Sequence, residues 1–307
     1  MTTTRNRGLA LAASTALISG VAIWVNSSGV AAYGNATAYT TAKNAAAALV
    51  IGVVFLIARA MRGAGSVSLT RPTRARGWWG LAYVAILGGA VPFLLFFQGL
   101  ASTASTQAAF LHKTLIVWVA LLAVPLLKEK LTLWHGAAIV LLVLGQLGLA
   151  GAVSFAPDLG IVMIGAATLM WSVEVVATKR LLVGITPWTV SLARMGGGSI
   201  ALLAWAGATG ALGRVVPGTS AQWGWVVLTG LLLAGYVLTW HQALWRAPAV
   251  DVTAVLVLGA IVTAALAGAF DGAPIAAKAP WLALLAAGGL LVWLAPRQGP
   301  LGRRDIT

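Results

Sequence analysis

Ten long apolar runs constrain this chain more than any other feature of its sequence. Each run has about 20 residues, the length that an α-helix rising 1.5 Å per residue needs to cross the hydrocarbon core of a bilayer. The runs occupy residues 8–28, 34–58, 78–99, 105–127, 132–154, 158–178, 187–208, 222–245, 250–270 and 279–296. We therefore expect an all-α integral membrane protein with ten transmembrane helices.

The composition agrees with this class. Of the 307 residues, 60% are hydrophobic and only 8% are charged, and the mean hydropathy of +0.94 is far above that of a soluble domain. The first run resembles the apolar core of a signal peptide, but it continues without a clear cleavage site, so we expect it to be the first transmembrane helix. The absence of cysteine excludes disulfides and thiolate metal sites, and we expect no cofactor and no metal.

The positions of the cations predict the orientation. A net charge of +14 suggests nucleic-acid binding in a soluble protein, but here most cations lie between apolar runs, where they act as topology signals. With a cytoplasmic N-terminus, the outside loops hold only Arg214 and Lys278. The inside segments hold Arg5, Arg7, Arg59, Arg62, Arg71, Arg74, Arg76, Lys128, Lys130, Lys179, Arg180, Arg246, Arg297, Arg303 and Arg304. We therefore expect a multi-pass protein of the inner or plasma membrane, with both termini cytoplasmic and no nucleic-acid partner.

An internal repeat divides the chain into halves. Residues 79–111 align with residues 223–255 at a constant offset of 144, which pairs Trp79 with Trp223, Gly80 with Gly224, Gln98 with Gln242 and Leu100 with Leu244. Five helices in each half force the second half to enter the membrane in the opposite direction. We therefore expect two inverted five-helix repeats, at residues 8–154 and 158–296, with the functional site between them.

The exit from the fourth run carries the sharpest motif. It reads Lys128-Glu129-Lys130-Leu131-Thr132 within the segment 125–136, and each half has a cation early in its second run, Lys43 and Arg194. These features resemble the EamA-type repeat of the drug/metabolite transporter superfamily, over residues 8–296. In the second half, the ninth run ends without a Glu-Lys-Leu sequence, which departs from the pattern.

The resemblance implies a secondary transporter of small organic metabolites. The substrates of such families are commonly amino acids or related compounds, and the direction is often export. The resemblance also matches Lys43 and Arg194 with the cation near the start of the second and seventh helices. It matches Trp24 and Trp171 with aromatic residues of the first and sixth helices.

Several polar side chains fall inside predicted spans, where a charge costs roughly 2.5–3.5 kcal/mol on insertion scales and is rare without a partner or a watery cavity. Those of the first half lie in the outer half of the membrane and those of the second half in the inner half, as inversion predicts. They are Lys43, Asn44, His112 and Lys113 in the first half, and Glu174, Arg194 and His241 in the second. We expect them to line substrate-binding walls or gates.

Structural alternatives exist for several of these side chains. Lys43 lies roughly seven residues deep, from where its amine can extend to the interface. Arg194 can reach the cytoplasm or pair with Glu174. His112 points about 100° away from Lys113 around the helix, so a packing role suits it as well as a site role. Lys113 has no obvious route to water, which favours a functional role.

The charges inside the spans predict the class of substrate. Three cations, Lys43, Lys113 and Arg194, stand against one acid, Glu174. A cavity lined in this way favours a carboxylate or phosphate over a lipophilic cation. Two repeat-matched amides can hydrogen-bond the substrate or join helices, and four aromatic side chains can form its apolar walls. These are Gln98 and Gln242, and Tyr39, Trp24, Trp118 and Trp171.

Two residues suit the coupling of transport to protons. Glu174 is the only acid well inside a predicted span, and protonation would remove its charge from the membrane interior. The alternative to proton coupling is that Glu174 forms an ion pair with Arg194 or Lys179. His241 titrates near neutral pH, as coupling requires, although a single histidine near a helix end is more often structural.

Other functional classes fit the sequence less well than transport. A multidrug exporter of lipophilic compounds is the main alternative. An integral membrane enzyme acting on lipid-linked substrates needs clustered acids, histidines or metal ligands, whereas the six acids and three histidines here are scattered. A channel needs a polar stripe along one pathway. We therefore expect no catalytic residues, with a small molecule and the lipid bilayer as partners, and the sequence carries no signal for an oligomeric state.

Overall fold

The computed structural model describes residues 2–63, 65, 67–103, 105–151 and 158–296. Every regular element in these residues is a helix, as the apolar runs predict. Arg297, Arg303 and Arg304, three of the cations assigned to the inside, and residues 152–154 of the fifth expected helix lie outside the described residues.

In the residues that the structure describes, the first half of the chain has seven helices. They are α1 (Thr2–Tyr33), α2 (Ala36–Arg62), α3 (Ala75–Gly89), α4 (Val91–Ser102), α5 (Ser105–Lys113), α6 (Leu115–Leu127) and α7 (Leu133–Ala150). Two pairs, α3 with α4 and α5 with α6, are each a single span with a local break. The first break follows from Pro92, which lacks the backbone N–H that continues a helix.

The described residues of the second half also form helices. It comprises α8 (Leu159–Leu181), α9 (Pro187–Leu192), the π-helical turn η1 (Ala193–Gly197), α10 (Gly198–Ala208), the short 3₁₀ turn η2 (Leu212–Arg214), α11 (Ser220–Arg246), α12 (Ala249–Val257), α13 (Gly259–Phe270) and α14 (Ile275–Leu294). Here α12 and α13 form one span with a break at Leu258.

Nine helical segments in the described part of the chain are long and apolar enough to cross a membrane. They are Thr4–Tyr33, Ala36–Arg62, Ala75–Ser102, Gln107–Leu127, Leu133–Ala150, Leu159–Leu181, Ser220–Arg246, Ala249–Phe270 and Ile275–Leu294. The remaining expected span, 187–208, is helical throughout, but η1 interrupts its regular α-helix. The described part of the chain is therefore a helical membrane protein with several spans. A tenth span remains a prediction.

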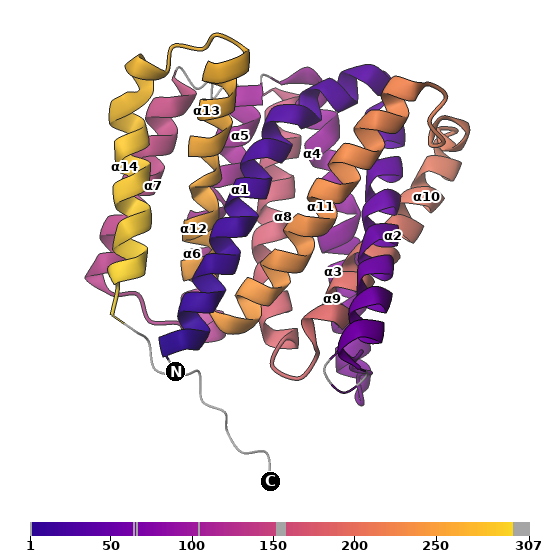
Figure 1. Cartoon of the computed structure of the whole chain (residues 1–307), viewed down its shortest axis with the longest axis horizontal. Helices are drawn as coiled ribbons and strands as arrows, with labels where there is room; N and C mark the ends of the chain where they lie inside the picture. The colour runs from indigo at the N-terminus through magenta and orange to yellow at the C-terminus, as the bar shows by residue number, and fades with distance from the viewer. Residues whose placement is uncertain (1, 64, 66, 104, 152–157, 297–307) are drawn as a thin grey trace.

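The helices run across a single slab, with α7 and α14 packed together at one edge and α2 beside α10 at the other (Figure 1). Between these edges, α1 and α11 cross the slab side by side in opposite directions. The beginning of α1 and the end of α14 lie at the same face. We call this the N-terminal face, and the opposite one the distal face.

The break between α5 and α6 recurs in the second half. Thr114 separates the first pair and Leu258 separates α12 from α13, at the same offset of 144 residues that aligns the sequence. A broken helix leaves carbonyl groups without partners in their own helix. The carbonyls of Leu256 and Val257 accept hydrogen bonds from Lys113 and Gln146 instead, so the break in one half is satisfied by side chains of the other.

Two glycines bring α3 against the π-helical turn. A Cβ atom added to Gly89 would overlap the carbonyl oxygen of Arg194 and lie 3.1 Å from the Cα atom of Gly198. Only a residue without a side chain fits such a contact between backbones. By contrast, Gly196 in the same turn has open space where its Cβ would be. The Gly89 contact therefore fixes where Arg194 lies.

We expect Gly89→Ala to lower the free energy of unfolding by about 1–3 kcal/mol, because the new methyl group forces α3 away from η1. The matched control is Gly196→Ala, which adds a methyl group to open space in the same turn. Thermal unfolding in detergent should give a lower midpoint for the first variant only. Equal midpoints would show that the helices can separate here without cost.

Candidate functional site

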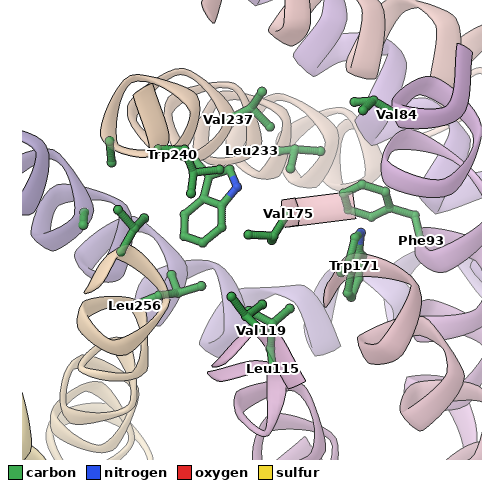
Figure 2. Close-up of a cluster of buried hydrophobic side chains, with 14 of the residues drawn as sticks. Val84, Phe93, Leu115, Val119, Trp171, Val175, Leu233, Val237, Trp240 and Leu256 are labelled. Atoms are coloured by element: carbon green, nitrogen blue, oxygen red, sulfur yellow. The ribbon is translucent and has the colours of Figure 1, made fainter. Parts of the chain in front are cut away.

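A central cavity of about 110 Å³ lies among α1, α2, α4, α8, η1 and α11, with α5 closing one side. Its apolar wall includes Phe93, Trp171, Val175, Leu233 and Trp240, which converge from different helices in Figure 2. Its polar wall brings together side chains that are far apart in sequence. These are Ser19, Asn26, Lys43, His112, Glu174, Arg194, Thr229 and Tyr236.

Lys43 on α2 is 2% exposed, so its amine does not extend to the interface. The amine lies 3.5 Å from the ring centroid of Phe97 and 5.2 Å from that of Tyr39. Its polar neighbour is Oδ1 of Asn26, at 3.4 Å. In the described part of the chain, no carboxylate lies within ion-pair distance of this amine. Aromatic faces and one amide oxygen therefore hold a cationic group without neutralising it.

Arg194 forms the second cationic wall. Its Nε atom lies 3.6 Å from Oε1 of Glu174, so the pairing that the sequence left as an alternative is present. At this distance the contact is an ion pair without a hydrogen bond. Glu174 Oε1 instead accepts a hydrogen bond of 2.6 Å from the Thr178 hydroxyl. Among the described atoms, Nη1 of Arg194 is buried with no hydrogen-bond partner.

The alternative partner of Glu174, Lys179, is engaged elsewhere. Its amine donates hydrogen bonds to the carbonyl oxygens of Leu244 and Ala247 at the end of α11, at 2.5 and 2.7 Å. Cations are favoured at helix C-termini, where carbonyl groups lack partners. Lys179 therefore caps a helix, and Arg194 alone pairs with Glu174 among the described residues.

Phe93 lies near both cations. The amine of Lys43 is 5.6 Å from its ring centroid, and the guanidinium carbon of Arg194 is 5.7 Å from it. Beside it, the ring of Trp171 packs edge to face at 5.2 Å, and its Nε1 donates to the carbonyl of Gly88. The geometry therefore places two positive groups near the same aromatic ring, with further aromatic rings around it.

His112 joins the same wall. Its ring packs edge to face against Phe96 and Trp171, at 5.5 and 5.3 Å. The Nδ1 atom is buried, and no described atom hydrogen-bonds to it. A buried polar atom without a partner is costly unless a water or ligand satisfies it. The central cavity thus presents unsatisfied groups on both Arg194 and His112.

A larger cavity of about 390 Å³ opens near the distal face, and we call it the outer cavity. Trp24 and Asp271 line it, joined by a hydrogen bond of 2.8 Å from Trp24 Nε1 to Asp271 Oδ2. Lys113 also lines it and is 3% exposed. The amine of Lys113 donates to the Ser19 hydroxyl at 3.3 Å and to the Leu256 carbonyl at 3.4 Å.

The expected site residues thus divide into three groups. Lys43, His112, Trp171, Glu174 and Arg194 line the central cavity, and Trp24 and Lys113 line the outer cavity. The remaining four, Asn44, Gln98, Gln242 and His241, lie outside both cavities. Trp118, expected as an aromatic wall, is 40% exposed and also lies outside both.

The four expected binding and coupling residues outside the cavities make contacts within and between helices. Gln98 donates to the Thr37 hydroxyl at 3.4 Å, which joins α4 to α2. Asn44 donates to the Thr40 carbonyl of its own helix. Gln242 accepts from Arg246 one turn further along α11. His241 Nδ1 lies 2.8 Å from the Ser191 hydroxyl, which joins α11 to α9. A substrate role for them stays a prediction.

Sequence reasoning missed several cavity residues. Asn26 accepts a hydrogen bond of 2.7 Å from Tyr39 and lies near Lys43, but its position in the first apolar run did not mark it as a site residue. Phe93, Phe96 and Phe97 all face the cavity. Their spacing of three and four residues, which places side chains on one helix face, is the signal that marks them.

A buried polar cluster closes the N-terminal face. Both carboxylate oxygens of Glu129 accept hydrogen bonds from the first backbone amides of α12, Ala249 at 2.7 Å and Val250 at 3.1 Å. Burial raises the pKa of Glu129, and these amides and the charge of Lys179 oppose that shift. An anion at a helix N-terminus satisfies otherwise unpaired amides. The motif of the fourth helix therefore ties the first half of the chain to the second.

Asp251 extends this cluster. Its carboxylate is 1% exposed and pairs with Nε of Arg5 at 2.9 Å, while its other oxygen lies 3.0 Å from Nε2 of His135. The sequence drew attention to Glu174 as the one acid well inside a span. That emphasis was incomplete, because Asp251 is equally buried at a helix end. Together these contacts join α1, α7 and α12 at the N-terminal face.

Comparison with known proteins gives two findings. The family model described as "EamA-like transporter family" matches residues 6–151 and again residues 158–295. A solved structure described only as the crystal structure of a protein superposes with a TM-score of 0.68 and 20% sequence identity, covering 92% of this chain and 96% of that chain. That similarity shows a shared fold. The comparison with curated proteins found no match.

We expect the contributions of Glu174 and Arg194 to the free energy of unfolding to depend on each other. Removing one partner leaves an uncompensated buried charge. Glu174→Gln and Arg194→Met should therefore each lower the free energy of unfolding by about 3–5 kcal/mol. The double variant should cost less than the sum of the two. Thermal unfolding of all four proteins in detergent measures this coupling, and strictly additive effects would contradict a direct pair.

Proposed function

Because the chain belongs to the EamA-like transporter family, we propose that it is a secondary transporter of small anionic or zwitterionic metabolites, amino acids or related compounds. Transport proceeds by alternating access between two inverted five-helix repeats, residues 8–154 and 158–296, ten helices in all. Both termini lie in the cytoplasm, as the distribution of cations favours. The direction is export from the cell, which rests on the resemblance to exporters of this superfamily.

The observation that carries this proposal is the pair of cationic groups around Phe93. Lys43 has no carboxylate within ion-pair distance in the described part of the chain, and Arg194 keeps a buried Nη1 without a hydrogen-bond partner. A substrate carboxylate would satisfy either group, since a guanidinium and an amine both donate to carboxylate oxygens. Because the site is shielded from water, such contacts are stronger than on a surface.

The walls of the central cavity favour an amphipathic substrate. Aromatic rings of Phe93, Trp171 and Trp240 suit an apolar side chain. Glu174 supplies one carboxylate that can face a substrate ammonium group, although Arg194 and Thr178 already engage it. A volume of about 110 Å³ favours a small metabolite over a bulky drug. The excess of positive groups disfavours a lipophilic cation.

The two ends of the molecule differ in a way that suits alternating access. The outer cavity opens near the distal face. At the N-terminal face, Glu129 and Asp251 hold α12 against the α6–α7 connection and α1. Such an arrangement corresponds to a state closed toward the cytoplasm, and breaking the Glu129 and Asp251 contacts would open the other side.

Proton coupling is part of the proposal and rests on Glu174. Protonation of its carboxyl would remove the negative charge that can face a substrate ammonium group, so a proton and a zwitterionic substrate compete for Glu174. In this scheme the protein exchanges substrate for a proton, as export against an inward proton gradient requires. His241, whose Nε2 is buried without a described partner, is the second coupling candidate.

Replacement of Lys43 tests the proposal. We expect Lys43→Met to leave the thermal unfolding midpoint unchanged or higher, because it removes a buried charge that has no carboxylate partner. The same change should abolish stabilisation by substrate, since a ligand that binds only the folded protein raises its midpoint. The measurement is thermal unfolding with amino acids, organic acids, phosphorylated metabolites and tetraphenylphosphonium.

Lys179→Met is the matched control. It also removes a largely buried lysine, but one whose amine satisfies two carbonyls at the end of α11. Its midpoint should therefore fall while stabilisation by substrate persists. The proposal is wrong if no anionic or zwitterionic compound stabilises the parent, or if tetraphenylphosphonium stabilises the parent and Lys43→Met equally. The latter result would favour a multidrug exporter.

A further inference from the structure

The outer cavity has the same balance of charges as the central cavity. Lys113 and Lys278 supply two amines, and Asp271 supplies one carboxylate. The central cavity likewise holds two cations and one acid, Lys43, Arg194 and Glu174. Two cavities with matching charge suit ligands of the same class. These ligands carry a carboxylate, either with an ammonium group or without one.

Lys113 is the deepest charged group of the outer cavity. It ends α5, about 12 Å from the first residue of that helix at a rise of 1.5 Å per residue. Its two hydrogen bonds, to Ser19 and Leu256, are 3.3 and 3.4 Å long, and both acceptors are uncharged. An ammonium group has three donors. A buried cation with long bonds to neutral oxygens favours a further, anionic ligand.

One wall separates the two cavities. Ser19, which accepts the hydrogen bond from Lys113, lines the central cavity, and Ile23 on the same face of α1 lines both cavities. On α5, His112 faces the central cavity while Lys113 faces the outer one. A ligand bound at Lys113 would therefore lie one layer of side chains from the central cavity.

We propose that the outer cavity is a second binding site, which takes the carboxylate group of the transported amino acid or organic acid on the amine of Lys113. The inference rests on the proposed function for its substrate class. The substrate occupies this site on the distal side of the wall formed by Ser19 and Ile23, before or after it occupies the central cavity. Asp271, held in place by Trp24, faces the ammonium group of a zwitterion at the rim.

Cysteine modification tests this site directly, because the chain has no native cysteine. Ala109 lines the outer cavity one helical turn before Lys113, so Ala109→Cys places a single thiol beside the amine. The anionic reagent 2-sulfonatoethyl methanethiosulfonate and its cationic trimethylammonium analogue are applied to cells and to inside-out vesicles. Mass spectrometry of the full chain then gives the rate of each reaction.

From the distal side, the anionic reagent should react at least about tenfold faster than the cationic one, relative to their rates with a free thiol. Lys113→Gln, which keeps a donor for the Leu256 carbonyl but removes the charge, should abolish this preference. Lys113→Arg keeps the charge and should retain it. The site is excluded if the thiol does not react from the distal side, or if the preference is the same in Lys113→Gln.

Ligand protection separates a binding site from a merely positive cavity. An equimolar mixture of neutral and acidic L-amino acids should slow the reaction of Ala109→Cys, and their amides, which lack the carboxylate, should not. Protection should persist in Ala109→Cys with Lys43→Met and be lost in Ala109→Cys with Lys113→Gln. Protection that depends on Lys43 and not on Lys113 would overturn the second site.

The two proposals fail in different measurements. Thermal shifts that depend on Lys43 report the central cavity, and thiol protection that depends on Lys113 reports the outer one. Stabilisation of the parent by amino acids, without protection of the introduced thiol in Ala109→Cys, would contradict the outer site alone. Protection of that thiol by amino acids, without any thermal shift that depends on Lys43, would contradict the central site and keep the outer one.

Discussion

Burial of charge away from water governs the interior of this protein. A charged group at membrane depth must find its partners within the protein, because lipid offers none. Glu129 accepts hydrogen bonds from the first amides of α12, and Lys179 donates hydrogen bonds to the last carbonyls of α11. Both charges therefore satisfy backbone groups at helix ends. Lys43 differs from these, since its described neighbours are aromatic rings and one amide oxygen. The absence of an internal anion for Lys43, among the residues that the structure describes, is the basis for assigning it to a substrate.

Breaks in the helices bring these groups together. The π-helical turn and its contact with Gly89 set the position of Arg194, and the break at Leu258 exposes the carbonyl that Lys113 binds. Such local departures from the α-helix cost stability, and transporters commonly place them at membrane depth where they line a site. These departures thus lie beside Arg194 in the central cavity and Lys113 in the outer cavity.

The length and composition of the apolar runs predicted the helical class, and the motif after the fourth run predicted the family. The pairing of Arg194 with Glu174 was one of two alternatives that the sequence left open. The sequence did not predict that Trp24 and Trp171, which occupy the first helix of each half, would line different cavities. Helical period tells which residues share a face, but it does not tell which helix that face meets. Asn26 shows the same limit, because its role depends on Tyr39 and Lys43 from another helix.

Exchange transport in proteoliposomes tests the central claim most directly. Vesicles loaded with an unlabelled amino acid that stabilises the parent are diluted into the same amino acid carrying a radiolabel, and uptake is followed. The account predicts uptake by the parent and by Lys179→Met protein that remains folded, and none by Lys43→Met, although that variant folds. Equal uptake by Lys43→Met and the parent would contradict a carboxylate site at Lys43.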